Sequence, residues 1–396
     1  MSEKQAVMTN DSETEIKRAF SLSRDERTAV REFFDGLCIE KEKPEAVIFF
    51  CSPDYDTVKL EKELNRQFGD IPLIGCTTAG EITPEGYHAG SITGAVLSRT
   101  HFTCVSKRYD MISNFNIQDG IEFGRSLKQQ LNRVADNASG SNSFAFMLID
   151  GLSGAEERVT ASLGSELGEI NLIGGSTADD FKLKQTQIFH DGRFHTDSAV
   201  VVMVHTDLPF QVSYTHHYVA SDAKAVITEA DPITREVLEI NGLPATREYA
   251  RLCGVEEKDL DIVVASKHPI MVKVGGTYFS RGVMGINHQN QSIKFACAID
   301  KGVVCSIARP DDPKQNLEKL FRDMENEIGP LALVIGCDCA ARKMNFQIQG
   351  ILDDMSQIYA ANNVIGFASF GEQFNSLHMN NSFSCVAIGS KARAHD

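Results

Sequence analysis

The chain has 396 residues, and 42% of them are hydrophobic, so it can bury a core large enough for two or three domains. The formal net charge is −15 and Lys and Arg do not cluster, which argues against nucleic acid or an anionic membrane surface as the main partner. No apolar run approaches the roughly 20 residues of a membrane-spanning helix, and residues 1–10 lack the layout of a signal peptide. We therefore expect a cytoplasmic protein that does not insert into a membrane.

Apolar residues recur at helical spacing in some segments and form short continuous runs in others. Helices are predicted over residues 16–38, 60–68, 117–135, 153–167, 231–241 and 315–328. Strands are predicted at residues 46–50, 94–97, 102–105, 144–149, 199–204, 331–335 and 384–388, and a series of short strands between 261 and 307. The runs 94–97 and 102–105 are expected to pair with each other as antiparallel strands.

One segment of twelve residues occurs three times, at 71–82, 170–181 and 362–373. The first two copies share six identical positions, and the third keeps the central glycine and a later Gly-Glu pair. Each copy follows a strand and a helix and precedes another strand. The repeat predicts an α/β (α+β) fold in which antiparallel or mixed sheets, built from strand-helix-strand-strand units, are covered by helices. We expect Gly75, Gly174 and Gly366 to occupy equivalent turns that only glycine tolerates.

The repeated segment also gathers hydroxyl and acidic side chains at one edge of a sheet, where a small ligand could bind. The candidate ligand-binding residues are Thr77, Thr78, Glu81, Ser176, Thr177, Asp180, Ser369 and Glu372. If the three acidic residues line a pocket, they favour a cationic or amino-bearing ligand. The alternative is that the segment is a structural turn whose carboxylates are solvated.

Catalytic and metal-binding motifs are absent. There is no P-loop, G-x-G-x-x-G, H-E-x-x-H or G-x-S-x-G segment, so we predict that the chain has no catalysis of its own. A cysteine-dependent hydrolase that uses Cys76 is an alternative, although no base is identifiable for it. The ten cysteines are expected to be reduced thiols, and the single pair Cys337 and Cys339 lacks the second pair of a structural zinc site. The sequence predicts no metal site.

Three stretches resemble the FIST proteins across about residues 30–390. They are residues 72–81, residues 173–180, and a closing pattern of Gly366, Phe370-Gly-Glu372, Leu377-His378 and Asn381. The resemblance implies a FIST N-terminal domain over residues 30–218 and a FIST C-terminal domain over residues 219–390. It also implies a sensor of small ligands that acts in signal transduction.

Stand-alone FIST proteins include haem-binding nitric oxide sensors that act on histidine kinases and cyclic-di-GMP signalling. This group implies haem b as cofactor, nitric oxide as a gas ligand, and a histidine kinase or cyclic-di-GMP enzyme as partner. A haem-free module that senses an amino acid or a similar metabolite is the alternative.

The histidines are the candidate haem ligands, because neutral imidazole is the usual proximal ligand of gas-sensing haem. His216 and His217 come first, since tyrosines flank them and they lie where the two halves meet. On a strand they would face opposite sides, so one of them at most points into a pocket. His190 and His378, each near a copy of the repeat, come next.

Overall fold

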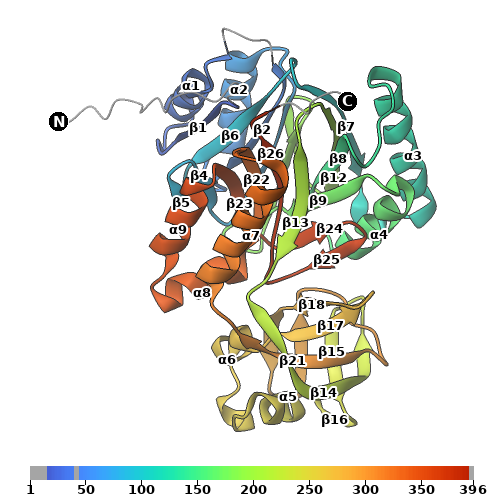
Figure 1. The fold of residues 1–396 in the computed structure, drawn as a ribbon. Helices are drawn as coiled ribbons and strands as arrows, with labels where there is room; N and C mark the ends of the chain where they lie inside the picture. The colour runs from blue at the N-terminus through green and yellow to red at the C-terminus, as the bar shows by residue number, and fades with distance from the viewer. Residues whose placement is uncertain (1–15, 40–43, 392–396) are drawn as a thin grey trace, which may run out of the picture.

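The computed structural model describes residues 16–39 and 44–391. Figure 1 shows a large body of strands covered by helices, and a smaller body below it. The large body, which we call the core, consists of three units that share one order of elements. The small body, residues 218–310, interrupts the third unit, and we call it the inserted domain. The predicted mixed α/β fold class is confirmed.

Each core unit runs edge strand, helix, strand, helix, strand, hairpin, strand. Core unit 1 (residues 16–98) contains β1 (Arg18–Ser21), α1 (Glu26–Leu37), β2 (Pro44–Cys51), α2 (Thr57–Phe68), β3 (Leu73–Thr77), β4 (Glu81–Thr83), β5 (Gly86–His88) and β6 (Ile92–Ser98). Core unit 2 (residues 102–206) contains β7 (Phe102–Asp110), α3 (Ile117–Val134), β8 (Ser143–Ile149), α4 (Glu156–Leu167), β9 (Asn171–Ser176), β10 (Ile188–His190), β11 (Arg193–His195) and β12 (Ser198–Thr206).

Core unit 3 (residues 210–215 and 311–390) has the same order with its second helix split in two. It contains β13 (Phe210–Thr215), α7 (Pro313–Ile328), β22 (Leu331–Cys339), α8 (Ala340–Gln349), α9 (Leu352–Ala361), β23 (Val364–Ser369), β24 (Glu372–Phe374), β25 (Leu377–Met379) and β26 (Phe383–Gly389). The inserted domain contains β14 (Tyr218–Asp231), β15 (Glu236–Ile240), β16 (Leu243–Pro244), α5 (Ala245–Cys253), α6 (Ile262–Lys267), β17 (Ile270–Val274), β18 (Thr277–Arg281), β19 (Val283–Asn287), β20 (Ser292–Phe295) and β21 (Val304–Pro310).

The three core units exchange their hairpins in a closed cycle. The β4–β5 hairpin of unit 1 extends the sheet of unit 3 by pairing with β23. The β10–β11 hairpin of unit 2 pairs with β3 of unit 1, and the β24–β25 hairpin of unit 3 pairs with β9 of unit 2. Each sheet therefore has six strands, four from its own unit and two from another. Because every unit completes a neighbour's sheet, the core folds as one body.

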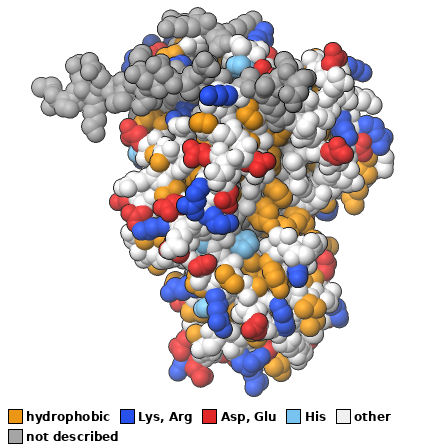
Figure 2. All heavy atoms as spheres, in the orientation of Figure 1, with side chains coloured by type: hydrophobic (Ala, Val, Ile, Leu, Met, Phe, Trp, Pro, Cys, Tyr) orange, Lys and Arg blue, Asp and Glu red, His pale blue; other side chains and the backbone are white. Residues whose placement is uncertain are grey.

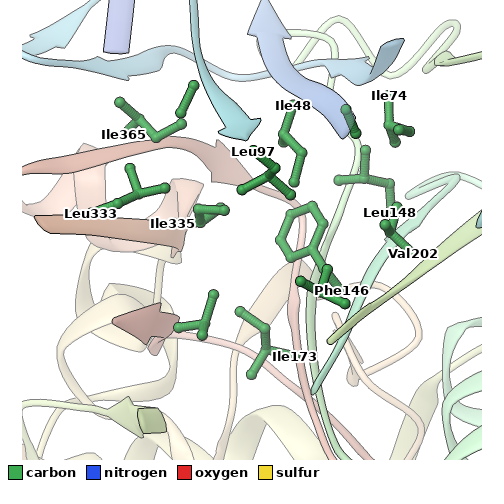
Figure 3. Packing of buried hydrophobic residues seen from close by; sticks show 14 of the residues in the cluster. Ile48, Ile74, Leu97, Phe146, Leu148, Ile173, Val202, Leu333, Ile335 and Ile365 are labelled. Atoms are coloured by element: carbon green, nitrogen blue, oxygen red, sulfur yellow. The ribbon is translucent and has the colours of Figure 1, made fainter. Parts of the chain in front are cut away.

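The inner faces of the three sheets pack against one another. Figure 3 shows this central cluster, in which Ile48, Phe146 and Ile335 come from equivalent central strands of the three units. The rings of Phe50 and Phe367, from units 1 and 3, lie 4.7 Å apart between centroids. Helices cover the outer face of each sheet over separate apolar clusters. These central strands are buried on both faces, which explains their nearly continuous apolar sequence.

Side-chain caps set where several helices begin. The carboxylate of Asp25 accepts a hydrogen bond from the backbone of Thr28, so α1 begins at Glu26. The prediction of a helix over 16–38 is therefore wrong for residues 18–21, which form β1. Asp312 caps α7 in the same way, and Pro313 occupies its first turn.

Two other predictions are wrong. Residues 231–241 form the turn and strand β15 instead of a helix, because Asp231 accepts the backbone N–H of Ile233 in a tight turn and Arg235 has a positive φ of 57°. The runs 94–97 and 102–105 do not pair. β6 pairs with β1 and β2, whereas β7 pairs with β12 in the sheet of the next unit.

The three repeated glycines occupy equivalent places, as predicted, but in strands instead of turns. Gly75, Gly174 and Gly366 lie within β3, β9 and β23. Close packing excludes a side chain there. A Cβ on Gly174 would lie 2.2 Å from the carbonyl oxygen of Met147, and one on Gly366 would lie 1.9 Å from that of Gly336.

The inserted domain is a curved antiparallel sheet with two helices and its own apolar cluster. The short strands predicted between 261 and 307 are confirmed from residue 270 on as β17 to β21, whereas residues 262–267 form the helix α6. The chain enters the domain at Tyr218 and leaves it at Pro310, and these two residues pair across β14 and β21. The two connections to the core therefore lie side by side. The predicted boundary at 218/219 between two FIST domains refers to the sequence and not to the two bodies described above, and it stays a prediction.

Candidate functional site

Two of the repeated acidic residues close the loops that follow the repeat. Glu81 is fully buried and accepts hydrogen bonds from the hydroxyl of Thr78 and from the backbone and hydroxyl of Ser91. Glu372 in unit 3 makes the same set of bonds, with Ser369 at 2.6 Å and with Ser382. Burial raises the pKa of Glu81 to about 7 and that of Glu372 to about 8, partly offset by the hydroxyl donors.

The second copy uses a different carboxylate. Asp180 is exposed and has a positive φ of 54°. Asp150, at the end of β8, takes its place: it accepts the backbone N–H of Asp197 at 2.6 Å and the hydroxyl of Thr186. Asp197 stands where Ser91 stands in unit 1. The repeat alignment missed Asp150 because the equivalent carboxylate reaches the same backbone group from another strand.

The remaining predicted ligand-binding residues are buried and bonded within the core. The hydroxyl of Thr77 accepts the backbone N–H of Gln187 at 3.0 Å, and that of Thr177 accepts the backbone N–H of Gly151 at 3.4 Å. Ser176 accepts a 2.9 Å bond from the Gln373 amide. These contacts stabilise the exchanged hairpins, and a ligand role for the repeat residues stays a prediction.

The four candidate histidines are distributed over the molecule. His216 and His217 lie in the connection between the core and the inserted domain, where Figure 2 shows histidine side chains below a group of lysines and arginines. His190 is in the exchanged hairpin of unit 2 and lines a surface cavity of about 370 Å³ that Asn65 and Pro72 also line. The structure therefore does not bring the four together.

The ring nitrogens of His216 and His190 are already engaged, whereas those of His217 and Nε2 of His378 have no hydrogen-bond partner among the described residues. His216 Nε2 is 3.1 Å from the carbonyl oxygen of Tyr278, and its Nδ1 accepts the backbone N–H of Tyr218. The ring nitrogens of His190 lie 3.0 Å from Ser106 Oγ and 3.0 Å from Asp191 Oδ2. The haem hypothesis stays a prediction.

Cys76 also gives no support to the hydrolase alternative. Its side chain is 0% exposed in the central apolar cluster. Burial raises the pKa of its thiol far above the ordinary value, and the neighbouring Cys51 and Cys337 add to the shift. A thiolate nucleophile is therefore disfavoured at this position.

The most unusual polar group lies where core unit 3 meets the inserted domain. Arg342, in the first turn of α8, is fully buried, and its Nε is 2.7 Å from Oδ1 of Asp338 at the end of β22. None of its three guanidinium nitrogens makes a hydrogen bond of regular geometry with a described residue. Oδ2 of Asp338 accepts 2.6 Å hydrogen bonds from the hydroxyls of Tyr87 and Tyr359. A buried cation with unused donors is rare in folded proteins, because each unmade bond is costly.

His217 lies beside this arginine. It is 2% exposed, and neither ring nitrogen has a hydrogen-bond partner among the described residues. Its ring packs on Tyr218, 4.4 Å between centroids, and on Phe346, 6.0 Å away. Burial lowers the pKa of His217 well below its usual value, and the charge of Arg342 lowers it further. The imidazole is therefore neutral at pH 7, with one donor and one acceptor nitrogen.

The inserted domain completes this site. The amide of Asn345 on α8 is 3.4 Å from the carbonyl oxygen of Ser266 in α6, and the hydroxyl of Tyr218 donates to the same oxygen at 3.0 Å. The backbone N–H of Asp311 donates to the carbonyl oxygen of His217 at 2.8 Å, which ties the two connections together. The sequence analysis missed Arg342 and Asp338. Their spacing of four residues after an apolar strand was the available signal.

Across residues 16–39 and 44–391, no helix is both long enough and apolar enough to cross a bilayer. Family models match two parts of the chain, a FIST N domain over residues 45–243 and a FIST C domain over residues 245–375. Their shared boundary falls within the inserted domain, next to β16.

A related protein is Uncharacterized protein MJ1623 of Methanocaldococcus jannaschii, which is 26% identical over 227 residues, or 55% of this chain. The match spans 43% of that protein's length. The two family matches together cover most of the chain, from the first central strand of the core to the last exchanged hairpin. The chain therefore belongs to the FIST family.

Proposed function

We propose that the chain senses a small metabolite with a carboxylate, an amino acid being the simplest, and that the carboxylate binds Arg342 and His217. The observation that carries the proposal is the fully buried guanidinium of Arg342, whose terminal nitrogens have no regular hydrogen bond among the described residues. The ligand site lies at the junction of the core and the inserted domain.

The chemistry of the guanidinium defines the ligand. Asp338 is its one ion-pair partner among the described residues, with Oδ1 2.7 Å from Nε. The two terminal nitrogens form a planar fork that matches a carboxylate with two parallel hydrogen bonds. Leaving such donors unpaired costs about 1–3 kcal/mol for each group, and a ligand carboxylate removes that cost. Neutral His217 can supply a further donor.

Asp338, Tyr87 and Tyr359 position the arginine. Burial lowers the pKa of Arg342, but the charge of Asp338 and the tyrosines outweigh it, so the guanidinium stays protonated. The predicted preference for a cationic ligand at Glu81 and Glu372 is a separate hypothesis. Both of those carboxyl groups already accept hydroxyl and backbone donors.

Signalling would follow from the position of this site. The inserted domain joins the core through two adjacent connections at Tyr218 and Pro310, which is the layout of a hinge. A ligand that contacts both bodies stabilises one relative orientation. We propose that a partner in the cytoplasm reads this orientation, a histidine kinase first and a cyclic-di-GMP enzyme as the alternative.

Haem-based sensing of nitric oxide is the competing hypothesis that the family resemblance implies. The ring nitrogens of His190 and His216 are engaged by other groups, so His217 and His378 are the histidines that remain for it. Titration of the purified chain with haemin separates the two, since a saturable Soret shift supports haem and its absence leaves the carboxylate ligand.

A thermal-shift screen of free amino acids and small organic acids tests the proposal. We expect at least one acid to raise the melting temperature of the wild-type chain. Arg342→Gln should abolish the shift, and Arg342→Lys should weaken it because lysine lacks the planar fork. The matched control is Arg281→Gln, another buried arginine of the same junction, whose Nη1 donates to the carbonyl oxygen of His378. Equal shifts in the Arg342 variants and the wild type would reject the site.

A reconstituted kinase assay tests the output. The ligand from the screen should change the autophosphorylation of the cognate kinase only when this chain is present. The Arg342→Gln variant should leave the kinase at its ligand-free level. If the ligand changes the autophosphorylation of the kinase equally with the wild-type chain and with Arg342→Gln, then Arg342 has no role in sensing.

A further inference from the structure

Three side chains from distant parts of the chain converge on one point at the junction. Glu157 comes from α4 of core unit 2, Cys297 follows β20 of the inserted domain, and His378 is in the exchanged strand β25 of core unit 3. One ligand atom from each lies within 4.8 Å of the other two. We propose that these residues bind one divalent transition-metal ion, best fitted by Zn²⁺, which fastens the inserted domain to the core.

The donor set matches the proposed ion. Thiolate, imidazole and carboxylate are the ligands of tetrahedral zinc sites. Cys297 is 0% and His378 is 2% exposed, whereas Glu157 is half-buried. Two donors are thus shielded from water, and the carboxylate gives the ion a path from solvent.

His378 has a ring nitrogen with no other use. Its Nε2 is buried and makes no hydrogen bond with a described residue, and its Nδ1 is 3.1 Å from the side-chain amide of Gln373. The Oε1 of Gln373 also has no partner among the described residues. Turning this amide places its oxygen against Nδ1, because the two orientations differ only in which atom is called nitrogen, and the hydroxyl of Ser176 then donates to that oxygen instead of accepting from the amide. The imidazole proton then sits on Nδ1 and the lone pair of Nε2 is free for the ion.

Neighbouring groups complete the coordination of the ion. The thiol of Cys297 donates a 2.7 Å hydrogen bond to Oδ1 of Asn380, and this oxygen can serve as the fourth ligand once the thiol has lost its proton. The backbone N–H of Ala298 holds the Glu157 carboxylate at 2.7 Å.

The nearby charges are nearly balanced, and Arg281 leaves one positive charge in excess. Arg235 pairs with Glu156 at 2.6 Å as well as with Glu157 at 2.7 Å, and Arg281 contacts the carbonyl oxygen of His378. On binding, the thiol of Cys297 releases one proton to solvent, so the ion's two charges meet one thiolate and one carboxylate. The Zn²⁺ site is independent of the carboxylate ligand proposed above.

Cobalt spectroscopy and zinc titration of the full chain test this site. The chain is stripped with a chelator in the Cys38→Ser background, since Cys38 is exposed and could bind metal adventitiously. We expect one equivalent of Zn²⁺ to bind saturably, one equivalent of Co²⁺ to give a thiolate charge-transfer band, and Zn²⁺ to raise the melting temperature.

Variants then assign the ligands. Cys297→Ser should lose the cobalt band, and His378→Ala and Glu157→Gln should each weaken binding at least tenfold. Cys305→Ser is the matched control, because Cys305 is a buried cysteine of the same domain. Its thiol donates a hydrogen bond to a backbone carbonyl oxygen, that of Ala225. It should keep the band and the stoichiometry.

Two results would overturn the proposal. The first is a Cys38→Ser chain in which Co²⁺ gives no saturable charge-transfer band and Zn²⁺ does not raise the melting temperature. This result contradicts the site without any further variant. The second is a Cys297→Ser chain that is folded by circular dichroism and keeps the full band. If Cys297→Ser fails to fold, the partly exposed Glu157→Gln variant decides, and unchanged affinity there contradicts the site.

Discussion

The hydroxyl of Tyr87 donates a 2.6 Å hydrogen bond to Oδ2 of Asp338, across 251 positions of the sequence. Tyr87 belongs to the hairpin that core unit 1 contributes to the sheet of unit 3. Asp338 in turn holds Arg342. The exchange of hairpins thus positions the residue that we propose to bind the ligand, so the integrity of the core and the geometry of the site are linked.

Replacing Tyr87 with Phe should lower the free energy of unfolding by about 1.5–3 kcal/mol, because it removes a hydrogen bond to a buried carboxylate. Equilibrium denaturation measures the change. Tyr109→Phe is the control, since its hydroxyl is 3.5 Å from Asp119 at the surface, and it should change stability by less than about 0.5 kcal/mol. Equal losses in the two variants would show that the Tyr87–Asp338 bond has no special role.

The pH dependence of stability should report Glu372. Its pKa is raised to about 8 in the folded chain from 4.5, so the folded state holds the proton more tightly and unfolding releases it. The stabilisation is present at low pH and is lost as pH rises through about 8. Between about pH 6.5 and 8.5 the wild-type chain should lose about 2 kcal/mol through this group, at about 1.4 kcal/mol for each pH unit.

Glu372→Gln mimics the protonated form and should remove this part of the dependence, leaving the smaller part from Glu81 and Glu156, whose pKa values burial raises to about 7. Glu318→Gln, at an exposed position on α7, should leave the wild-type slope unchanged. The window avoids His378, whose pKa is lowered to about 4 by burial and whose contribution therefore changes at lower pH. If Glu372→Gln and the wild type lose equal stability over this window, Glu372 is ionised in the folded chain.

The strand glycines should tolerate no side chain. Gly366→Ala places a Cβ 1.9 Å from a backbone oxygen, which neither strand can avoid without shifting, so we expect a loss of several kcal/mol or an insoluble product. Gly285→Ala in β19 is the matched change, since its Cβ would be 3.9 Å from the nearest atom. Denaturation midpoints should differ strongly between the two. Similar midpoints would contradict the close approach of β22 and β23.

Arg235 should be essential to the junction. It forms ion pairs with Glu156 at 2.6 Å and Glu157 at 2.7 Å, and Glu156 is 1% exposed. Arg235→Gln leaves a buried carboxylate unpaired and should cost about 3–5 kcal/mol by denaturation. Lys301→Gln, which removes an exposed pair with Glu229, should cost at most about 1 kcal/mol. A small loss for Arg235→Gln would mean that the inserted domain docks without this contact.

The fold class and the threefold repeat could be predicted because both are local signals. The apolar runs at 46–50, 144–149 and 331–335 become the central strands β2, β8 and β22. The exchange of hairpins could not be predicted, since a strand's sequence does not specify which sheet it joins. The insertion of residues 218–310 into core unit 3 could not be predicted for the same reason. It follows from the pairing of β13 with β26, which lies at the far end of the chain.

The candidate site was harder to predict from the sequence. The repeat pointed to Glu81 and Glu372, which are buried and bonded within their own loops. His217 was a candidate from its flanking tyrosines, but as a haem ligand, and Arg342 carries no motif. Both are buried without hydrogen-bond partners among the described residues, which only packing creates. Asp150 shows the limit of the repeat itself, because unit 2 supplies the equivalent carboxylate from a different strand.

Isothermal titration can show whether Arg342 binds the carboxylate of a small ligand. The strongest acid from the screen is titrated into the wild-type chain beside its own carboxamide, which has the same shape without the negative charge. We expect saturable binding of the acid at one site and at least tenfold weaker binding of the carboxamide, a difference of about 1.4 kcal/mol or more. Equal binding of the acid and the carboxamide, or unchanged binding of the acid by Arg342→Gln, would contradict the proposed site.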